Sequence, residues 1–183
     1  MTSPDQLEAS DAHIRGLALL NLRVTRDAFQ SAVSGLSEQQ ARFKPSPDRW
    51  SIEEIVEHVA VAEHGMYRYI SDLHEVTTDP HTAESAASLA RTSDRKKLPL
   101  AAPERALPKH RFDSLAAALA KFLENRARTI EFVENCTDDL RFRVIQHPLG
   151  LINGQDCLTV LIRHADRHID QINELRADPG FPR

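Results

Sequence analysis

The sequence predicts an all-α fold: a single domain over residues 1–183, a four-helix bundle with a long irregular insertion at 77–111 between its second and third helices. Three observations predict this class. The chain contains 6 glycines and 5% aromatic residues beside abundant alanine, leucine and glutamate, a composition that favours helix over sheet. Four long segments repeat apolar residues every three to four positions, the spacing of one helix face. No segment shows a convincing strand pattern, so helices are expected to pack on helices.

The first helix is expected from about residue 11 to residue 34. Its apolar residues form a broad face for the bundle interior: Ile14, Leu17, Ala18, Val24, Ala28, Phe29 and Val33. Gly35 is suited to end this helix, because glycine accepts the left-handed backbone that follows many helices. A short helical turn is expected at 37–40, before Pro45 and Pro47 interrupt the chain.

The second helix has the clearest start signal in the chain. Ser51 and Glu54 are spaced to form a capping box, in which each side chain bonds to the other residue's amide. Trp50 precedes the cap and can pack on Ile55 or a neighbour as a hydrophobic staple. The apolar stripe contains Ile52, Ile55, Val59, Ala62, Met66 and Ile70. His58 therefore lies at the edge of the buried stripe.

The helical pattern dissolves in the segment 77–111, which is rich in alanine, serine and basic residues. Four prolines interrupt it: Pro80, Pro99, Pro103 and Pro108. A short helix is compatible with residues 84–89. A loop of this length is either functional, as a lid or partner contact, or partly disordered, and a simple surface excursion is the other reading.

Two further amphipathic helices complete the bundle. The third is expected from near Ser114 to Asn135, and the fourth from close to Gln155 to about Arg176. An irregular connection is expected between them, at 141–150. Asp178, Pro179 and Gly180 should end the fourth helix.

The charge and the cysteines limit the function classes. A net charge of −4 gives no electrostatic reason to expect nucleic acid or an anionic membrane as a partner. No apolar run approaches the roughly 18 residues that span a bilayer, and the N-terminus has no secretory signal pattern. Cys136 and Cys157 are isolated and are expected to be reduced thiols. These features predict a cytoplasmic protein.

Two histidines near the C-terminus are the strongest chemical signal. His164 and His168 stand four residues apart and so share a helix face. The spacing is compatible with two explanations: a shared metal ion, or half-exposed rings that bond to neighbouring helices. His58 completes a three-imidazole site only if the second and fourth helices are neighbours. Gln171, one turn beyond His168, is a candidate to hydrogen-bond a ring or orient a ligand.

At these residues the chain resembles the DinB-like (damage-inducible) superfamily, which includes the YfiT-like metal-dependent hydrolases. Residues 50–58, W-S-I-E-E-I-V-E-H, resemble the family's W-S-x-x-E-[IL]-x-x-H signature. Residues 164–172, H-A-D-R-H-I-D-Q-I, followed by P-G-F-P at 179–182, resemble its C-terminal H-x-x-R-H-x-x-Q-I ending. Leu149 and Gly150, which lead into the fourth helix, complete a resemblance that covers most of the chain.

This resemblance implies a four-helix bundle, often a homodimer, with a divalent metal held by His58, His164 and His168. Zinc and nickel are both suited to three imidazoles with open positions. Some relatives are transferases or isomerases that use low-molecular-weight thiols. The long segment 77–111 departs from a compact member of the family. Glu54 is best explained as a cap, and Arg167 as a structural ion pair or dimer contact, so no catalytic residue beyond the ligands is assigned.

The candidate residues and the family resemblance lead to two hypotheses for the function. The first is a metal-dependent hydrolase or thiol-dependent transferase, in which a metal-activated water or thiol attacks a small-molecule substrate. The second is a non-catalytic, dimeric helical-bundle binding or stress-response protein with a structural metal or none. Neither function involves nucleic acid or membrane, because no basic helix or aromatic-basic surface pattern appears.

Overall fold

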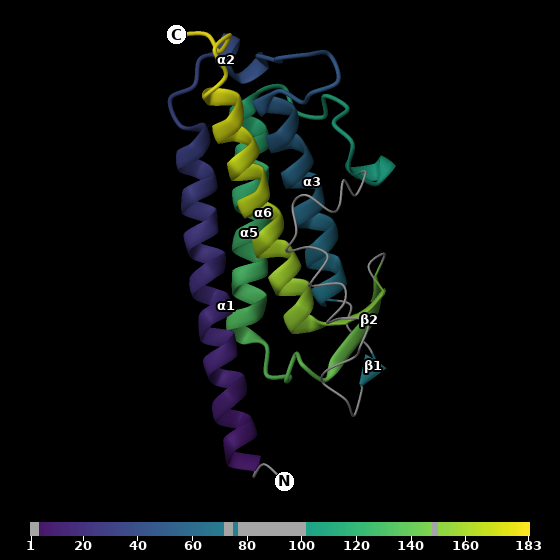
Figure 1. Ribbon diagram of the computed structural model, residues 1–183. Helices are drawn as coiled ribbons and strands as arrows, with labels where there is room; N and C mark the ends of the chain where they lie inside the picture. Colours follow the sequence, from purple (N-terminus) through teal and green to yellow (C-terminus); the bar gives the residue numbers. More distant parts are fainter. Residues whose placement is uncertain (1–3, 72–74, 77–101, 148–149) are drawn as a thin grey trace.

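Four long helices pack side by side in the computed structural model, which describes residues 4–71, 75–76, 102–147 and 150–183 (Figure 1). Two shorter helices lie at the periphery of this bundle. The long helices are α1 (Pro4–Val33), α3 (Ile52–Ser71), α5 (Leu115–Asn135) and α6 (Gly154–Arg176). The short ones are α2 (Glu38–Arg42) and the 3-10 turn η1 (Glu104–Ala106). The predicted all-α bundle is confirmed; the possible helix at 84–89 lies outside the described residues.

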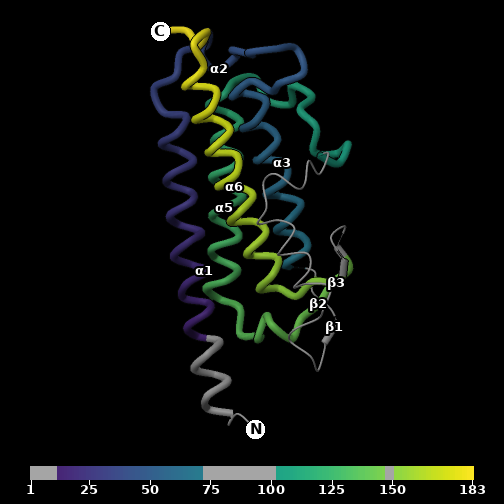
Figure 2. Tube along the Cα trace, in the orientation of Figure 1, coloured from purple at the N-terminus to yellow at the C-terminus, as the bar shows by residue number. Residues whose placement is uncertain are grey.

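The direction of the helices explains the long segment between α3 and α5. Helices α3 and α5 run the same way and pack along their length, whereas α1 and α6 run the opposite way (Figure 2). A helix the size of α3 is about 30 Å long. The chain must therefore return along the bundle before α5 begins. The segment predicted as an insertion is the crossover that this topology requires.

The start of α3 and the end of α1 agree with the sequence signals, whereas α1 begins at Pro4 rather than near residue 11. The Ser51 amide donates to Glu54 Oε2 at 2.8 Å, and the Glu54 amide donates to Ser51 Oγ at 3.3 Å. This capping box confirms the predicted start of α3, and Trp50 packs on the apolar cluster that contains Ile55. Gly35 has φ +71, the left-handed conformation that glycine adopts at low cost. Local sequence therefore places the ends of these helices.

A short β-sheet replaces the irregular connection expected at 141–150. Strand β2 (Arg143–His147) pairs antiparallel with β3 (Gly150–Asn153), and β1 (Glu75–Val76) adds to the other edge of β2. The expectation of no strand was wrong here because the strands are too short to show an alternating pattern. Ile152 of β3 is fully buried in one of the two apolar clusters that form the core, so tertiary packing stabilises the hairpin.

The core consists of two apolar clusters with a polar layer between them. On every long helix, the residues of one cluster precede those of the other. Between them lies Arg126 of α5, whose guanidinium is fully buried and donates to both carboxylate oxygens of Glu63 on α3 and to Thr25 on α1. The histidines of α6 occupy the same interval along the bundle. The polar residues thus share one level of the core.

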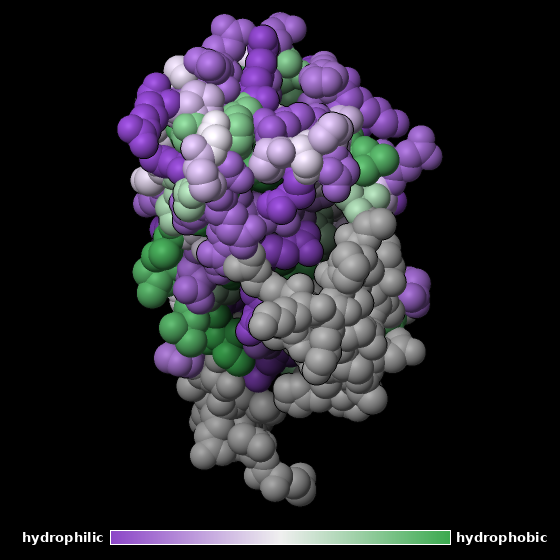
Figure 3. Space-filling model, turned by 45° about the horizontal axis from the view of Figure 1, so that its top comes forward, coloured by the Kyte–Doolittle hydropathy of each residue, from purple (hydrophilic) through white to green (hydrophobic). Residues whose placement is uncertain are grey.

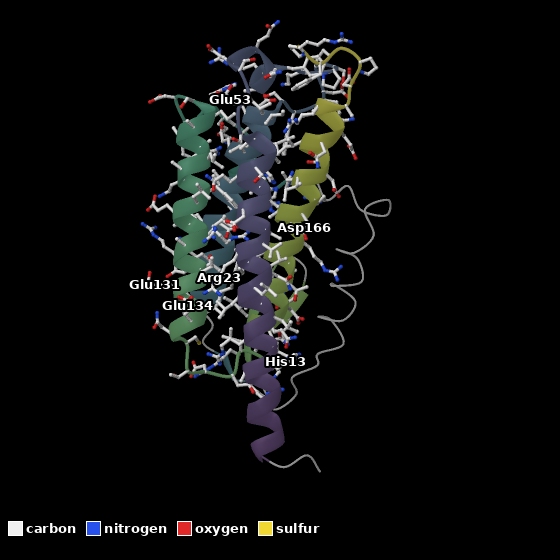
Figure 4. All side chains as sticks on the ribbon, turned by 90° about the vertical axis from the view of Figure 1, so that its left-hand side faces the viewer. His13, Arg23, Glu53, Glu131, Glu134 and Asp166 are labelled. Carbon is white, nitrogen blue, oxygen red and sulfur yellow. The ribbon has the colours of Figure 1, made fainter. Side chains whose placement is uncertain are left out.

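The outer faces of the described helices carry ion pairs and, on α1, an apolar stripe. Arg23 of α1 pairs with Glu134 of α5 across the surface where these helices meet (Figure 4). Exposed apolar side chains on α1 form the stripe, visible along the left edge of Figure 3. Its residues are Leu17, Leu20 and Val24. The expectation that Leu17 and Val24 face the bundle interior was therefore wrong, because the apolar residues of α1 extend beyond the face that the other helices cover. Within the described residues, no helix combines the length and apolar content needed to cross a membrane.

Candidate metal centre

Three histidines from two helices converge in the polar layer. His58 comes from α3, and His164 and His168 come from successive turns of α6, which packs against α3. The Nε2 atom of His164 lies 3.1 Å from Nε2 of His58 and 3.2 Å from Nε2 of His168. His58 and His168 are 3% and 2% exposed, whereas His164 is half-buried. The condition set by the sequence, that the second and fourth helices be neighbours, is met.

Hydrogen bonds to Nδ1 of two of the rings determine which ring nitrogen carries the proton. His58 Nδ1 lies 2.8 Å from the carbonyl oxygen of Ala106, and His168 Nδ1 lies 2.7 Å from Gln171 Oε1. Both partners are acceptors, so both Nδ1 atoms must be the donors. Their Nε2 atoms therefore present lone pairs to the centre of the cluster. Gln171 occupies the place beside His168 that the sequence predicted for it.

Among the three rings, acceptors outnumber donors where the Nε2 atoms converge. With neutral rings, only His164 can carry a proton on Nε2, so the rings supply at most one proton to the three nitrogens; the other donor beside them is Arg167 Nη2, 3.4 Å from Nε2 of His168. Ligands held about 2.0–2.1 Å from a tetrahedral zinc ion lie about 3.3–3.4 Å apart. The two Nε2 separations of 3.1 and 3.2 Å are close to that spacing. The three residues therefore fit a divalent metal ion.

The surroundings keep the three rings neutral. Burial lowers the pKa of His58, and the charge of Arg167 lowers it further although the Ala106 carbonyl opposes the shift. Burial, then the repulsion that a second protonated ring beside His58 would meet and the charge of Arg167, lower the pKa of His168 to about 3, although the bond to Gln171 opposes the shift. Burial and the two neighbouring rings hold the pKa of His164 well below its usual range. Neutral imidazole is the form that binds metals, so the site is ready for a cation near pH 7.

Arg167 contributes a positive charge beside the cluster. Sequence reasoning favoured an ion pair or dimer contact for this residue, because its position is rotated about the helix from the histidine row. The structure places its Nη2 3.4 Å from Nε2 of His168. A long, flexible stem lets the guanidinium reach a site that its backbone position does not face. Arg167 therefore faces the same centre as the three Nε2 atoms.

An open cavity of about 370 Å³ borders the residues that contact the histidines. Its lining includes Trp50, whose ring centroid lies 4.9 Å from that of His58, and Gln171, the partner of His168. Arg49 and Glu174 add opposite charges to the same cavity. The cavity is large enough for a small molecule, but none of the three histidines lines it.

Glu54, one turn before His58 on α3, already has a role. Burial raises the pKa of Glu54, but hydrogen bonds from Lys44 and Ser51 outweigh it and leave that pKa below its usual value. Its oxygens accept from Lys44 Nζ at 2.9 Å and from the Ser51 amide at 2.8 Å. Glu54 is thus the cap that the sequence indicated.

The fold and the histidine cluster together define a four-helix-bundle protein with a site built across α3 and α6. The family model of the DinB superfamily matches residues 21–172, which include His58, His164 and His168. The chain belongs to the DinB superfamily.

A solved structure with a similar fold is that of YfiT from Bacillus subtilis, described as a probable metal-dependent hydrolase with an unusual four-helix bundle topology. The TM-score is 0.60 at 17% sequence identity, and the alignment covers 100% of this chain and 92% of that one. At this identity the likeness concerns the fold. No functionally curated protein matches the chain.

Proposed function

We propose that this protein is a divalent-metal-dependent enzyme, a hydrolase or a thiol-dependent transferase, with His58, His164 and His168 as metal ligands. The observation that carries the proposal is the convergence of three Nε2 atoms, two of them with Nδ1 bonded to an oxygen acceptor. The family membership and the description of YfiT as a probable metal-dependent hydrolase support the same class.

The chemistry would require open coordination positions. A divalent metal bound by three imidazoles lowers the pKa of a coordinated water or thiol, and so supplies a nucleophile near neutral pH. Ala106 and Gln171 hold the rings of His58 and His168 in one tautomer. Zinc and nickel both suit a three-imidazole donor set.

Arg167 supports a reaction that involves an anion at the cluster. Its guanidinium lies beside Nε2 of His168, so it attracts negative charge to the side on which the three nitrogens converge. A deprotonated water or thiol carries such a charge, as does a carboxylate substrate. The cavity lined by Trp50 and Gln171, which contact His58 and His168, is a candidate binding place for a small molecule or a low-molecular-weight thiol.

Elemental analysis tests the metal site directly. Protein purified without a histidine tag should contain near-stoichiometric zinc or nickel, and His58→Ala and His168→Ala should lose it. His64→Ala is the matched control, because His64 is an exposed histidine on the same helix as His58. Metal that persists in both ligand variants, or that is absent from the wild type, would overturn the proposal and favour a non-catalytic binding protein.

The homodimer implied by the family resemblance is also a proposal. The stripe of Leu17, Leu20 and Val24 supports it, since these side chains on α1 are 47%, 55% and 55% exposed. Spacings of three and four residues place them on one helix face, suited to pack against the same face of a second copy. The cytoplasmic location stays a prediction.

A further inference from the structure

The described end of the crossover segment folds over the first half of α3. In the turn η1, the Ala106 amide donates to the Pro103 carbonyl at 2.7 Å, and the Leu107 amide donates to the Glu104 carbonyl at 3.2 Å. Ala106 is buried, and its carbonyl accepts from His58 Nδ1 at 2.8 Å. A backbone atom of this segment therefore orients one of the three clustered histidines.

Glu57, the residue before His58, anchors the segment to α3. Its side chain is nearly buried, and Oε1 accepts from the Lys109 amide at 2.8 Å and from Arg111 Nη1 at 2.7 Å. A carboxylate that accepts from an amide and from a guanidinium makes charge-assisted hydrogen bonds, which are the stronger kind.

Arg111 closes the segment on itself around Ala106. Its Nη1 donates to the Leu107 carbonyl at 2.7 Å, and its Nη2 donates to the Arg105 carbonyl at 3.1 Å. These carbonyls belong to the residues on either side of Ala106. One guanidinium thus holds both flanks of the residue whose own carbonyl meets His58.

The turn that makes this arrangement possible is strained. His110, between Lys109 and Arg111, has φ +53, a left-handed conformation that is unfavourable for a residue other than glycine. Such a conformation persists where surrounding contacts over-determine it. Here the turn brings the Lys109 amide and the Arg111 side chain to the same oxygen of Glu57.

We infer that Glu57 and Arg111 are positioning residues for His58, which they orient by holding the Ala106 carbonyl against its Nδ1. This inference rests on the proposed metal site. Because coupling between two equilibria is reciprocal, a segment that favours metal binding is itself stabilised by the metal. Metal binding and docking of residues 102–111 on α3 should therefore strengthen each other.

The first test measures metal affinity by competition with a chromogenic chelator, with zinc as the probe. Glu57→Gln and Arg111→Met should each bind zinc about 10- to 100-fold more weakly than the wild type, the usual effect of losing a partner that supports a ligand. Glu53→Gln is the matched control, because Glu53 lies on the same helix as Glu57 but pairs with Arg42, which is outside this segment. Its affinity should stay within about threefold of the wild type.

The second test is limited trypsin digestion, which measures how accessible the segment itself is to cleavage. Arg105 and Lys109 are exposed cleavage sites within it. Zinc should slow cleavage after these two residues in the wild type, relative to cleavage elsewhere in the chain. The same protection should be much smaller in Glu57→Gln at equal zinc saturation.

The outcomes separate this inference from the proposed function. A wild-type protein that binds no metal would overturn both. Zinc affinity in Glu57→Gln and Arg111→Met equal to that of Glu53→Gln, with tight binding in the wild type, would overturn the positioning role alone. A lower melting temperature of the metal-free variants with unchanged zinc affinity would assign Glu57 and Arg111 a structural role instead, and so would also overturn it.

Discussion

Replacing Gln171 with methionine isolates the role of one hydrogen bond in metal affinity. Gln171 Oε1 accepts from His168 Nδ1 at 2.7 Å, and His168 is 2% exposed. In metal-free Gln171→Met, the ring is free to move its proton to Nε2 and donate into the cluster. A metal on Nε2 forbids that tautomer, so the buried N–H stays without a partner only in the metal-bound state.

The magnitude follows from that difference. A buried donor left without an acceptor costs about 1–3 kcal/mol, which corresponds to a zinc dissociation constant about 5- to 150-fold higher. The usual effect of removing a histidine's supporting partner, about 10- to 100-fold, falls in the same range. Metal-free stability should change much less than metal affinity, since the ring has an alternative tautomer when no ion is bound.

Chelator competition, followed with zinc at pH 7, measures this dissociation constant. Gln155→Met is the matched control, because Gln155 lies in the first turn of α6, away from the histidines. The control should bind zinc as the wild type does. If Gln171→Met also binds zinc as tightly as the wild type while His168→Ala loses it, the reasoning about the tautomer is refuted.

Three further predictions concern the core, the ionisation of the histidines and the assembly. Glu63→Gln leaves the buried Arg126 guanidinium uncompensated and should lower the free energy of unfolding by about 3–5 kcal/mol in urea denaturation; a loss under about 1 kcal/mol would contradict this. The pKa of His168, about 3 in the folded protein against 6.5 ordinarily, means that only the unfolded chain takes up this proton as the pH falls. The free energy of unfolding of metal-free protein should therefore be insensitive to this group above about pH 6.5, and should fall by up to about 1.4 kcal/mol per pH unit below it. Urea denaturation between pH 7 and pH 5.5 measures that slope, and His168→Gln should flatten it; an identical slope in the variant would exclude this origin. Leu20→Glu should convert the proposed dimer to a monomer in analytical ultracentrifugation, whereas Leu107→Glu, an exposed apolar site on another element, should not; a monomeric wild type would refute the dimer.

The features that the sequence determined are those encoded by short-range contacts. The start of α3 follows from Ser51 and Glu54, whose reciprocal bonds involve residues three apart. The pairing of His164 with His168 follows from helix periodicity, as does the reach of Gln171 to His168. The family signatures then pointed to His58 as the third member of the cluster. The four helices and these candidate residues were accordingly predictable from the sequence alone.

Tertiary structure decided which distant surfaces meet. Only the packing of α3 against α6 brings His58 within 3.1 Å of His164, and only the parallel course of α3 and α5 shows that 77–111 is a crossover. The β2–β3 hairpin depends on burial of Ile152, which a run of so few residues does not reveal. The partner of His58 is the backbone carbonyl of Ala106, an atom common to every residue type, so no sequence pattern could identify it. The helices and histidines are local properties of the chain, whereas the converging nitrogens and their supports exist only where separate segments are packed together.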